Sequence, residues 1–157
     1  MANPEQMSLT PFRLRRGRRT DFIAVMELLA LSGTPIPPAD RATLRRFRHL
    51  TADLGTDLYL AVCGERVVGI VHVTYARQLT TGTLARIEIL VVAPDRRFQG
   101  IGAALVALAR QRAQRRGCVQ LLCGHALPAG EIDGFFAATG WQRSGTVFSI
   151  DLAALAG

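Results

Sequence analysis

The sequence has no lysine, and cysteine and aromatic residues are scarce, at 3 cysteines and 6% aromatics in 157 residues. Cys63, Cys118 and Cys123 are odd in number and lack the spacing of a disulfide framework or of a zinc site. Cys123 and His125 stand two residues apart, but no second pair of metal ligands accompanies them. We therefore expect buried, reduced thiols and no metal.

Long apolar runs are also missing. No stretch reaches the roughly 18 to 20 apolar residues that a membrane-spanning helix needs, and residues 1–10 lack the apolar region of a secretory signal. We expect a cytoplasmic protein with no membrane partner. The length and a hydrophobic content of 49% fit one packed domain. The predicted organisation is a flexible N-terminus over residues 1–10 and a single domain over residues 11–157.

Charge of one sign dominates the chain. There are 19 basic residues, all arginine, against 12 acidic ones, for a net charge of +7. A positive field favours anionic ligands, and both a phosphate-bearing cofactor and nucleic acid meet that description. The N-terminal arginines between residues 13 and 19 lack the interleaved aromatic residues of a base-stacking surface. We interpret this run, Arg13, Arg15, Arg16, Arg18 and Arg19, as a solvated face and expect no nucleic-acid partner.

Hydrophobic periodicity predicts strands and helices in mixed order. Strands are predicted over residues 12–14, 58–63, 67–75, 84–92, 119–123 and 146–152, and helices over residues 22–29, 41–54, 99–116 and 131–139. An antiparallel hairpin beside a strand–helix–strand crossover is typical of an α/β (α+β) sandwich around a mixed sheet.

The strand over residues 84–92 has the clearest alternation. Its odd positions are all apolar and are expected to share the core face, whereas Arg86 and Glu88 occupy the opposite face. The odd positions are Ala85, Ile87, Ile89 and Val91.

The turn after this strand carries the most specific pattern in the chain. Gly100 and Gly102 stand at the first turn of the predicted helix, where backbone N–H groups are unpaired and the dipole is positive. Arg96 and Arg97 add positive charge. This combination predicts a phosphate site, although the segment is neither a Walker loop nor a complete dinucleotide fingerprint.

The pattern Arg97-x-x-Gly100-x-Gly102, directly after Ile-Glu-x-Leu-Val-Val-x-Pro, resembles the cofactor motif of the GNAT (Gcn5-related N-acetyltransferase) superfamily. The order of elements and the late Gly140-Trp141 pair are also similar. The resemblance implies a mixed, mostly antiparallel sheet of about six to seven strands flanked by about four helices. It also implies an N-acetyltransferase that uses acetyl-CoA as the acyl donor.

The resemblance further implies where coenzyme A binds. The strands over residues 84–92 and 119–123 are expected to separate, and Leu90 N–H is expected to donate to the thioester carbonyl. The amine attacks the thioester directly in this family, so Cys123 is not needed as a nucleophile. The implied cofactor-binding residues are Leu90, Val91, Val92, Arg97, Phe98, Gln99, Gly100, Ile101, Gly102, Ala103 and Phe136.

Proton transfer needs a base for the amine and an acid for the departing thiolate. Glu88 is the candidate base, with an ion pair to Arg86 or a cross-strand neighbour as the alternative. The family commonly carries a tyrosine as the acid where this sequence has Phe136. His125 is the candidate catalytic substitute, with Tyr75 as another, and an exposed loop histidine is the alternative interpretation of His125. His72 is expected to be structural or to line the acceptor site.

The acceptor is expected to be a small-molecule amine. A protein N-terminus or a lysine is the alternative acceptor. A non-catalytic acyl-CoA-binding module is the alternative function, because Phe136 cannot donate a proton and the asparagine common in the preceding loop is absent. Dimers are common in the family, so the resemblance also allows a homodimer.

Overall fold

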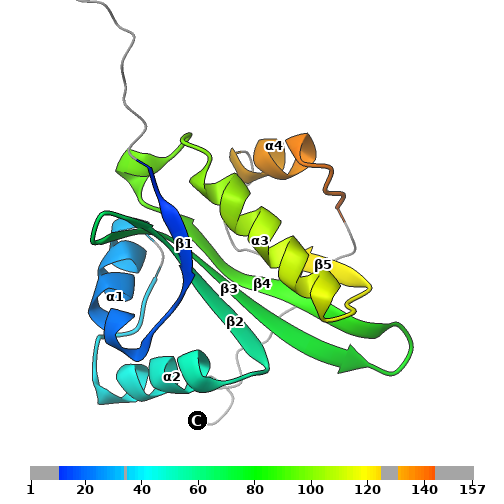
Figure 1. The fold of residues 1–157 in the computed structure, drawn as a ribbon, viewed down its shortest axis with the longest axis horizontal. Helices are drawn as coiled ribbons and strands as arrows, with labels where there is room; N and C mark the ends of the chain where they lie inside the picture. The colour runs from blue at the N-terminus through cyan, green and yellow to red at the C-terminus, as the bar shows by residue number, and fades with distance from the viewer. Residues whose placement is uncertain (1–10, 34, 125–130, 144–157) are drawn as a thin grey trace, which may run out of the picture. The chain divides into compact units, whose positions relative to one another are not determined.

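The computed structural model describes residues 11–33, 35–124 and 131–143, and the chain divides into two compact units after residue 125. The second unit contributes α4 (Glu131–Ala138). The first unit contains, in chain order, β1 (Arg13–Arg16), the 3-10 helix η1 (Arg19–Asp21), α1 (Phe22–Leu31), α2 (Arg41–Ala52), β2 (Thr56–Cys63), β3 (Arg66–Gln78), β4 (Gly82–Val92), the 3-10 helix η2 (Pro94–Arg96), α3 (Ile101–Arg115) and β5 (Gln120–Cys123) (Figure 1). The expected flexible N-terminus, His125 and the strand predicted over residues 146–152 lie outside the described residues.

The sheet has five strands in the order β1-β2-β3-β4-β5. Neighbouring strands are antiparallel except β4 and β5, which are parallel and are connected by α3. The predicted mixed, mostly antiparallel sheet with four α-helices is confirmed. The five strands among the described residues are fewer than the six to seven that the resemblance implied.

α3 covers one face of the sheet and crosses in front of the strands in Figure 1. Its apolar stripe packs directly on β3, where Gly69 leaves room for it. A Cβ at this position would lie 2.9 Å from Ile101 and 3.0 Å from Leu105, so a side chain here would push α3 away. The side chains of Ile101 and Leu105 are buried.

α2 covers the opposite face. Successive residues of a strand point to opposite faces, and the neighbours Thr56 and Asp57 of β2 separate in this way. Asp57 contacts Arg112 of α3 at 3.1 Å, while the Thr56 hydroxyl donates to the Leu50 carbonyl of α2 at 3.2 Å. The sheet is therefore the middle layer of the predicted sandwich.

A β-bulge interrupts the pairing of β3 with β4. Val73 pairs with Ile87 and His72 pairs with Ile89, so Glu88 is an extra residue on β4. Because paired residues share a face, the side chains beyond the bulge switch sides relative to those before it.

The bulge corrects the predicted pattern of β4. Ala85 and Ile87 are fully buried on the α3 side, but Ile89 and Val91 lie on the opposite face. The prediction that all four odd positions share one face is wrong, because one inserted residue reverses the alternation.

A buried carboxylate connects the sheet to α3. The Asp57 side chain is fully buried; it accepts hydrogen bonds from Tyr75 at 2.7 Å and from Arg112 at 3.1 Å. Arg116 and Arg16 lie 3.5 and 3.6 Å from its oxygens. Burial by itself would raise the pKa of Asp57, but the hydrogen bonds and the arginine charges outweigh it and lower the pKa. The carboxylate is therefore held in its charged form.

Candidate active site

The outer edge of β4 is open toward its C-terminal end. β5 pairs with β4 from Leu84 only as far as Ile87, which lies opposite Cys123, the last residue of β5. From Glu88 to Val92, no strand among the described residues pairs with β4 on this side. The open edge begins at the bulge and agrees with the expected separation of these two strands.

Backbone groups of alternate residues point to this open edge. Ala93 N–H donates to the Val68 carbonyl at the end of the β3 ladder at 2.8 Å, so the backbone groups of Val91, two residues earlier, also point toward β3. The N–H and C=O groups of Leu90 and Val92 therefore point away from β3. An extended ligand can bond to them as an added strand.

α3 begins shortly after this edge with unpaired donors. Its first backbone hydrogen bond runs from Ala104 N–H to the Gly100 carbonyl at 3.0 Å. The N–H groups of Ile101, Gly102 and Ala103 precede this bond and have no acceptor within the helix. Together with the positive end of the helix dipole, these donors suit a phosphate group.

Two residues with positive φ shape the turn before α3. Gly100 has φ of +79°, and a Cβ built on it would meet nothing within 4 Å. The backbone conformation rather than lack of space therefore requires glycine here. Phe98 has φ of 62° and a fully exposed side chain, which is an uncommon, strained arrangement for a large residue.

The other implied cofactor residues differ in what they offer. Arg97 is exposed and has no ion-pair partner in the described part of the chain. Gln99 is half-buried and donates to the Asp95 carbonyl at 3.5 Å. The side chains of Val91 and Ile101 are buried. Val91 also turns its backbone toward β3, so it is the one implied β4 residue that does not face the open edge.

An ion pair that the sequence analysis missed holds the loop between β4 and α3. The guanidinium of Arg66, at the β2–β3 turn, donates to both carboxylate oxygens of Asp95 at 2.7 and 3.0 Å. Such a bidentate pair fixes orientation as well as distance. No signal in the sequence links these residues, which are 29 positions apart.

Glu88 has a defined partner on β3. The Thr74 hydroxyl donates to Oε1 of Glu88 at 2.7 Å. The alternative ion pair with Arg86 is not formed, and no other described basic side chain pairs with Glu88. The carboxylate is half-buried at the bulge, where the open edge begins.

Two titratable side chains feel the charge of Glu88. His72 is 6% exposed, and its Nε2 has no hydrogen-bond partner among the described residues. Burial lowers the pKa of His72, although the charge of Glu88 opposes this, so the imidazole is neutral at pH 7. Burial and then Glu88 raise the pKa of Cys123 to about 11. Cys123 is therefore a protonated thiol and a weak nucleophile at neutral pH.

Of the two other candidate acids, Tyr75 and His125, the structure describes only Tyr75. Tyr75 follows Thr74 on β3, so it points to the opposite face, where its hydroxyl donates to Asp57. Burial and this hydrogen bond raise the pKa of Tyr75 well above its usual value. His125 lies outside the described residues, so its candidate role stays a prediction.

Phe136 belongs to α4 in the second unit. Its ring packs against Phe135 and Trp141, with centroids 5.3 and 4.8 Å apart. The phenyl ring has no proton to donate, so this residue offers an apolar contact only.

In the described part of the chain, no group of three or more His, Cys, Asp or Glu side chains is arranged to hold a metal ion. None of the helices described is both long and apolar enough to cross a membrane.

Known proteins resemble this chain in sequence pattern and in fold. The family model described as "Acetyltransferase (GNAT) family" matches residues 22–130, whereas no curated protein sequence matches the chain. Among solved structures, a transcriptional regulator from Bacillus halodurans is similar at 26% identity and a TM-score of 0.81, covering 90% of this chain and 100% of that one. Glucosamine-6-phosphate N-acetyltransferase from Arabidopsis thaliana is similar at 17% identity and 0.80, covering 90% and 99%.

A third similar structure is that of AAC(6')-Iy in complex with a bisubstrate analog, CoA-S-monomethyl-acetylneamine. It has 15% identity and a TM-score of 0.77, and the match covers 90% of this chain and 97% of that one. At such identities the structural likeness shows the fold, while the family model spans more than half of the sequence. The chain therefore belongs to the GNAT acetyltransferase family.

Proposed function

We propose that this chain is an acetyl-CoA-dependent N-acetyltransferase that moves the acetyl group directly from the thioester to a primary amine of a small molecule. One observation carries the proposal. The open β4 edge, with the outward backbone groups of Leu90 and Val92, ends nine residues before Ile101, where the unpaired N–H groups of α3 begin. Backbone groups that can pair with an extended chain are thus followed by N–H groups that can bind phosphate. This is the order that a pantetheine arm and a pyrophosphate require.

The residues around the edge fit this donor. Pantetheine amides would pair with Leu90 and Val92, and the N–H groups from Phe98 to Ala103 would surround the pyrophosphate. Leu90 N–H would donate to the thioester carbonyl, where negative charge develops during attack. Arg97 adds an exposed positive charge beside the phosphates.

Glu88 is the proposed base. A substrate amine is protonated at neutral pH and must lose a proton before it attacks, directly or through a water. The Thr74 hydrogen bond orients the carboxylate, and its second oxygen, Oε2, accepts no hydrogen bond from the described residues. No cysteine nucleophile is needed, in agreement with the protonated state of Cys123.

The small-molecule acceptor is supported by the relatives alone. One similar structure is named glucosamine-6-phosphate N-acetyltransferase, and another holds the bisubstrate analog CoA-S-monomethyl-acetylneamine. A protein amine remains the alternative acceptor.

A non-catalytic acyl-CoA-binding module is the second candidate function. The observation that favours it is the Phe136 ring, packed between two aromatic neighbours with no proton to give. Both candidates use the same cofactor site, so turnover distinguishes them.

Calorimetric titration with acetyl-CoA, followed by thiol-release assays against a panel of amines, tests the proposal. Binding with turnover supports the enzyme. Binding without turnover on any amine or peptide supports the binding module. An absence of binding would contradict both.

A further inference from the structure

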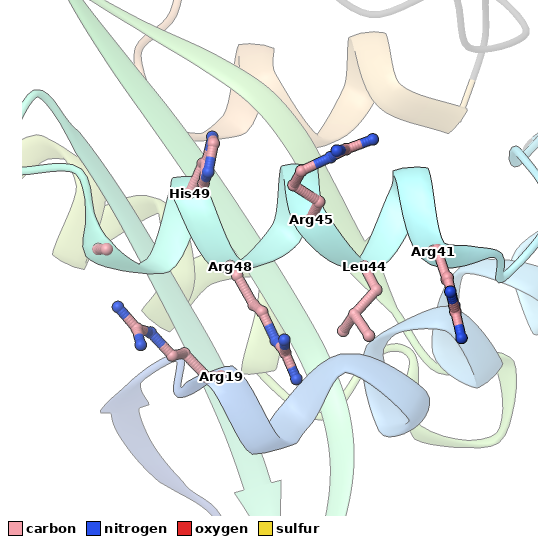
Figure 2. Close-up of a pocket in the computed structure, with 7 residues that line it drawn as sticks. Arg19, Arg41, Leu44, Arg45, Arg48 and His49 are labelled. Atoms are coloured by element: carbon pink, nitrogen blue, oxygen red, sulfur yellow. The ribbon is translucent and has the colours of Figure 1, made fainter.

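A second group of basic side chains lies on α2, outside the site described above. Arg41, Arg45, Arg48 and His49 fall at positions i, i+4, i+7 and i+8, which is one face of the helix. Arg19 of η1 joins them, and these side chains line a hollow of about 540 Å³ together with Leu44 and Ala52. Figure 2 shows Arg41 and Arg48 projecting from α2 toward η1 and α1. We call Arg19, Arg41, Arg45, Arg48 and His49 the α2 basic face.

No acidic group among the described residues neutralises the α2 basic face. All five of its side chains are exposed, and none of its arginines forms an ion pair with a described carboxylate. The two acidic residues that flank α2 are engaged locally. Asp40 accepts from Thr43 N–H at 2.8 Å, and Asp53 accepts from Gly55 N–H at 2.7 Å.

The contrast with other arginines is informative. Arg15 pairs with Asp21, and Arg16 lies 3.6 Å from Asp57, so two members of the N-terminal arginine run are used within the fold. Only Arg19 of that run joins the α2 basic face. The expectation of no nucleic-acid partner was based on the N-terminal run, whereas the arginines without ion-pair partners discussed here lie mainly on α2. Like charges gathered without counter-charges repel one another, and a bound anion would relieve that repulsion.

The shape of the face indicates which anion. Arg41 and Arg48 are seven residues apart, a rise of about 10 Å along the helix. This spacing spans successive phosphates of a chain rather than a single phosphate. Guanidinium groups bind phosphate oxygens in bidentate fashion. No phenylalanine, tyrosine or tryptophan of the described residues lines the hollow, so it lacks the large rings on which single-stranded bases stack.

We propose that the α2 basic face binds the phosphate backbone of duplex nucleic acid without sequence selectivity. This binding is independent of the acetyl-CoA site and of the proposed reaction. Phosphate contacts position a protein on a duplex but do not read bases, so the face confers location rather than sequence recognition.

Fluorescence anisotropy with a labelled 20-base-pair duplex DNA of mixed sequence tests this proposal, with duplex RNA and single-stranded DNA as further arms. The wild-type chain is expected to bind both duplexes more tightly than the single strand. Because each neutralised phosphate contributes a slope of about −0.9 in log K against log salt, four arginines predict a slope near −3 to −4.

The triple variant Arg41→Gln, Arg45→Gln, Arg48→Gln is expected to weaken duplex binding at least tenfold at about 100 mM salt and to reduce the slope by about 3. The matched control is the triple variant Arg77→Gln, Arg110→Gln, Arg115→Gln, which removes the same charge from exposed positions on β3 and α3. It is expected to bind within about threefold of wild type. If the first triple melts at a lower temperature, the three single substitutions provide the same comparison.

Three outcomes would overturn the proposal. The first is a failure of the wild-type chain to bind duplexes at low salt. The second is an equal loss of binding in both triple variants, which would indicate that binding depends on the overall charge of the chain. The third is tighter binding of a poly-glutamate peptide than of duplex, which would assign the face to an acidic protein. Acetyl-CoA titration of the same variants is expected to be unchanged, so failure of the proposed enzyme function and failure of this proposal are distinguishable.

Discussion

The Thr74 hydroxyl of β3 donates a 2.7 Å hydrogen bond to Oε1 of Glu88, the extra residue of the β-bulge in β4. The bond places a half-buried carboxylate at the start of the open β4 edge. This hydrogen bond distinguishes two roles of Glu88, the general base and the ion-pair partner of an arginine. A carboxylate that is oriented by a neutral hydroxyl can still accept a proton from a substrate amine, whereas an arginine partner would oppose that protonation.

The Glu88→Gln substitution is expected to lower turnover by about 10²- to 10⁴-fold, which is the range for a positioned general base. Its affinity for acetyl-CoA is expected to stay within about twofold of wild type. Thr74→Val removes only the orienting hydrogen bond and is expected to cost less. Steady-state thiol release and calorimetry measure the two effects. Wild-type turnover in the Glu88→Gln variant would show that the carboxylate is not the base.

Replacing Gly100→Leu is expected to weaken acetyl-CoA binding at least tenfold, because the left-handed turn and the close approach of the phosphates both depend on glycine. Gly117→Leu is the matched control, since this residue follows the other end of α3 with φ of +69° and open space around it. Similar strain is therefore imposed away from the phosphates. Calorimetry should detect weakened acetyl-CoA binding only in the Gly100→Leu variant. Equal losses of affinity in both variants would show that the phosphates do not bind at the start of α3.

Leu90→Pro is expected to lower turnover about 10²- to 10³-fold, the loss typical of one oxyanion-type donor. Its N–H points away from β3, so the sheet loses no hydrogen bond within the described chain. Val91→Pro removes an N–H directed at β3 and is expected to unfold the chain or lower its melting temperature strongly. Circular dichroism and thiol release provide the comparison, and unchanged turnover in folded Leu90→Pro would contradict the assigned donor.

Cys123→Ala is expected to retain turnover within about threefold. The thiol has its pKa raised to about 11 by burial and by Glu88, so it stays protonated below that pH and is not activated for attack. Mass spectrometry after incubation with acetyl-CoA should show no acetylated Cys123. An acetyl adduct on this residue that the amine then consumes would replace direct transfer with a covalent mechanism.

Asp57→Asn is expected to lower the free energy of unfolding by about 1 to 3 kcal/mol at pH 7, because three partly exposed arginines lose the buried carboxylate that they share. The pKa of Asp57 is lowered in the folded chain, so its stabilising effect is present above the unfolded-state pKa and disappears as the pH falls through the folded-state value. Urea denaturation from pH 7 to pH 3 should therefore show a shallower acid loss in the variant. A parallel loss in both proteins would assign the acid sensitivity to other groups.

Much of the fold follows from local patterns. The alternation of β2 and β3, the apolar stripe of α3 and the Arg97-x-x-Gly100-x-Gly102 turn are properties of adjacent residues, so the elements and the phosphate-binding turn could be predicted before any contact was known. Element ends were less certain. The helix predicted over residues 41–54 ends at Ala52, and Leu54 lies beyond it and is 80% exposed.

Contacts between distant residues could not be predicted in this way. The Arg66–Asp95 pair and the network around Asp57 join residues from separate strands and helices. No periodicity marks Asp57 as buried, since a single aspartate at the start of a strand is ordinarily exposed.

By itself the sequence determined the order of strands and helices, the glycine turn before α3 and the positive charge of the chain, because these depend on neighbouring residues and on composition. The tertiary structure alone decided which face each residue of β4 occupies. Strand register arises from pairing with β3, and one extra residue at Glu88 turns Ile89 and Val91 to the other side. The same pairing gave Glu88 a hydroxyl partner rather than an arginine, because hydrogen-bond partners are set by distance in space and not by distance along the chain.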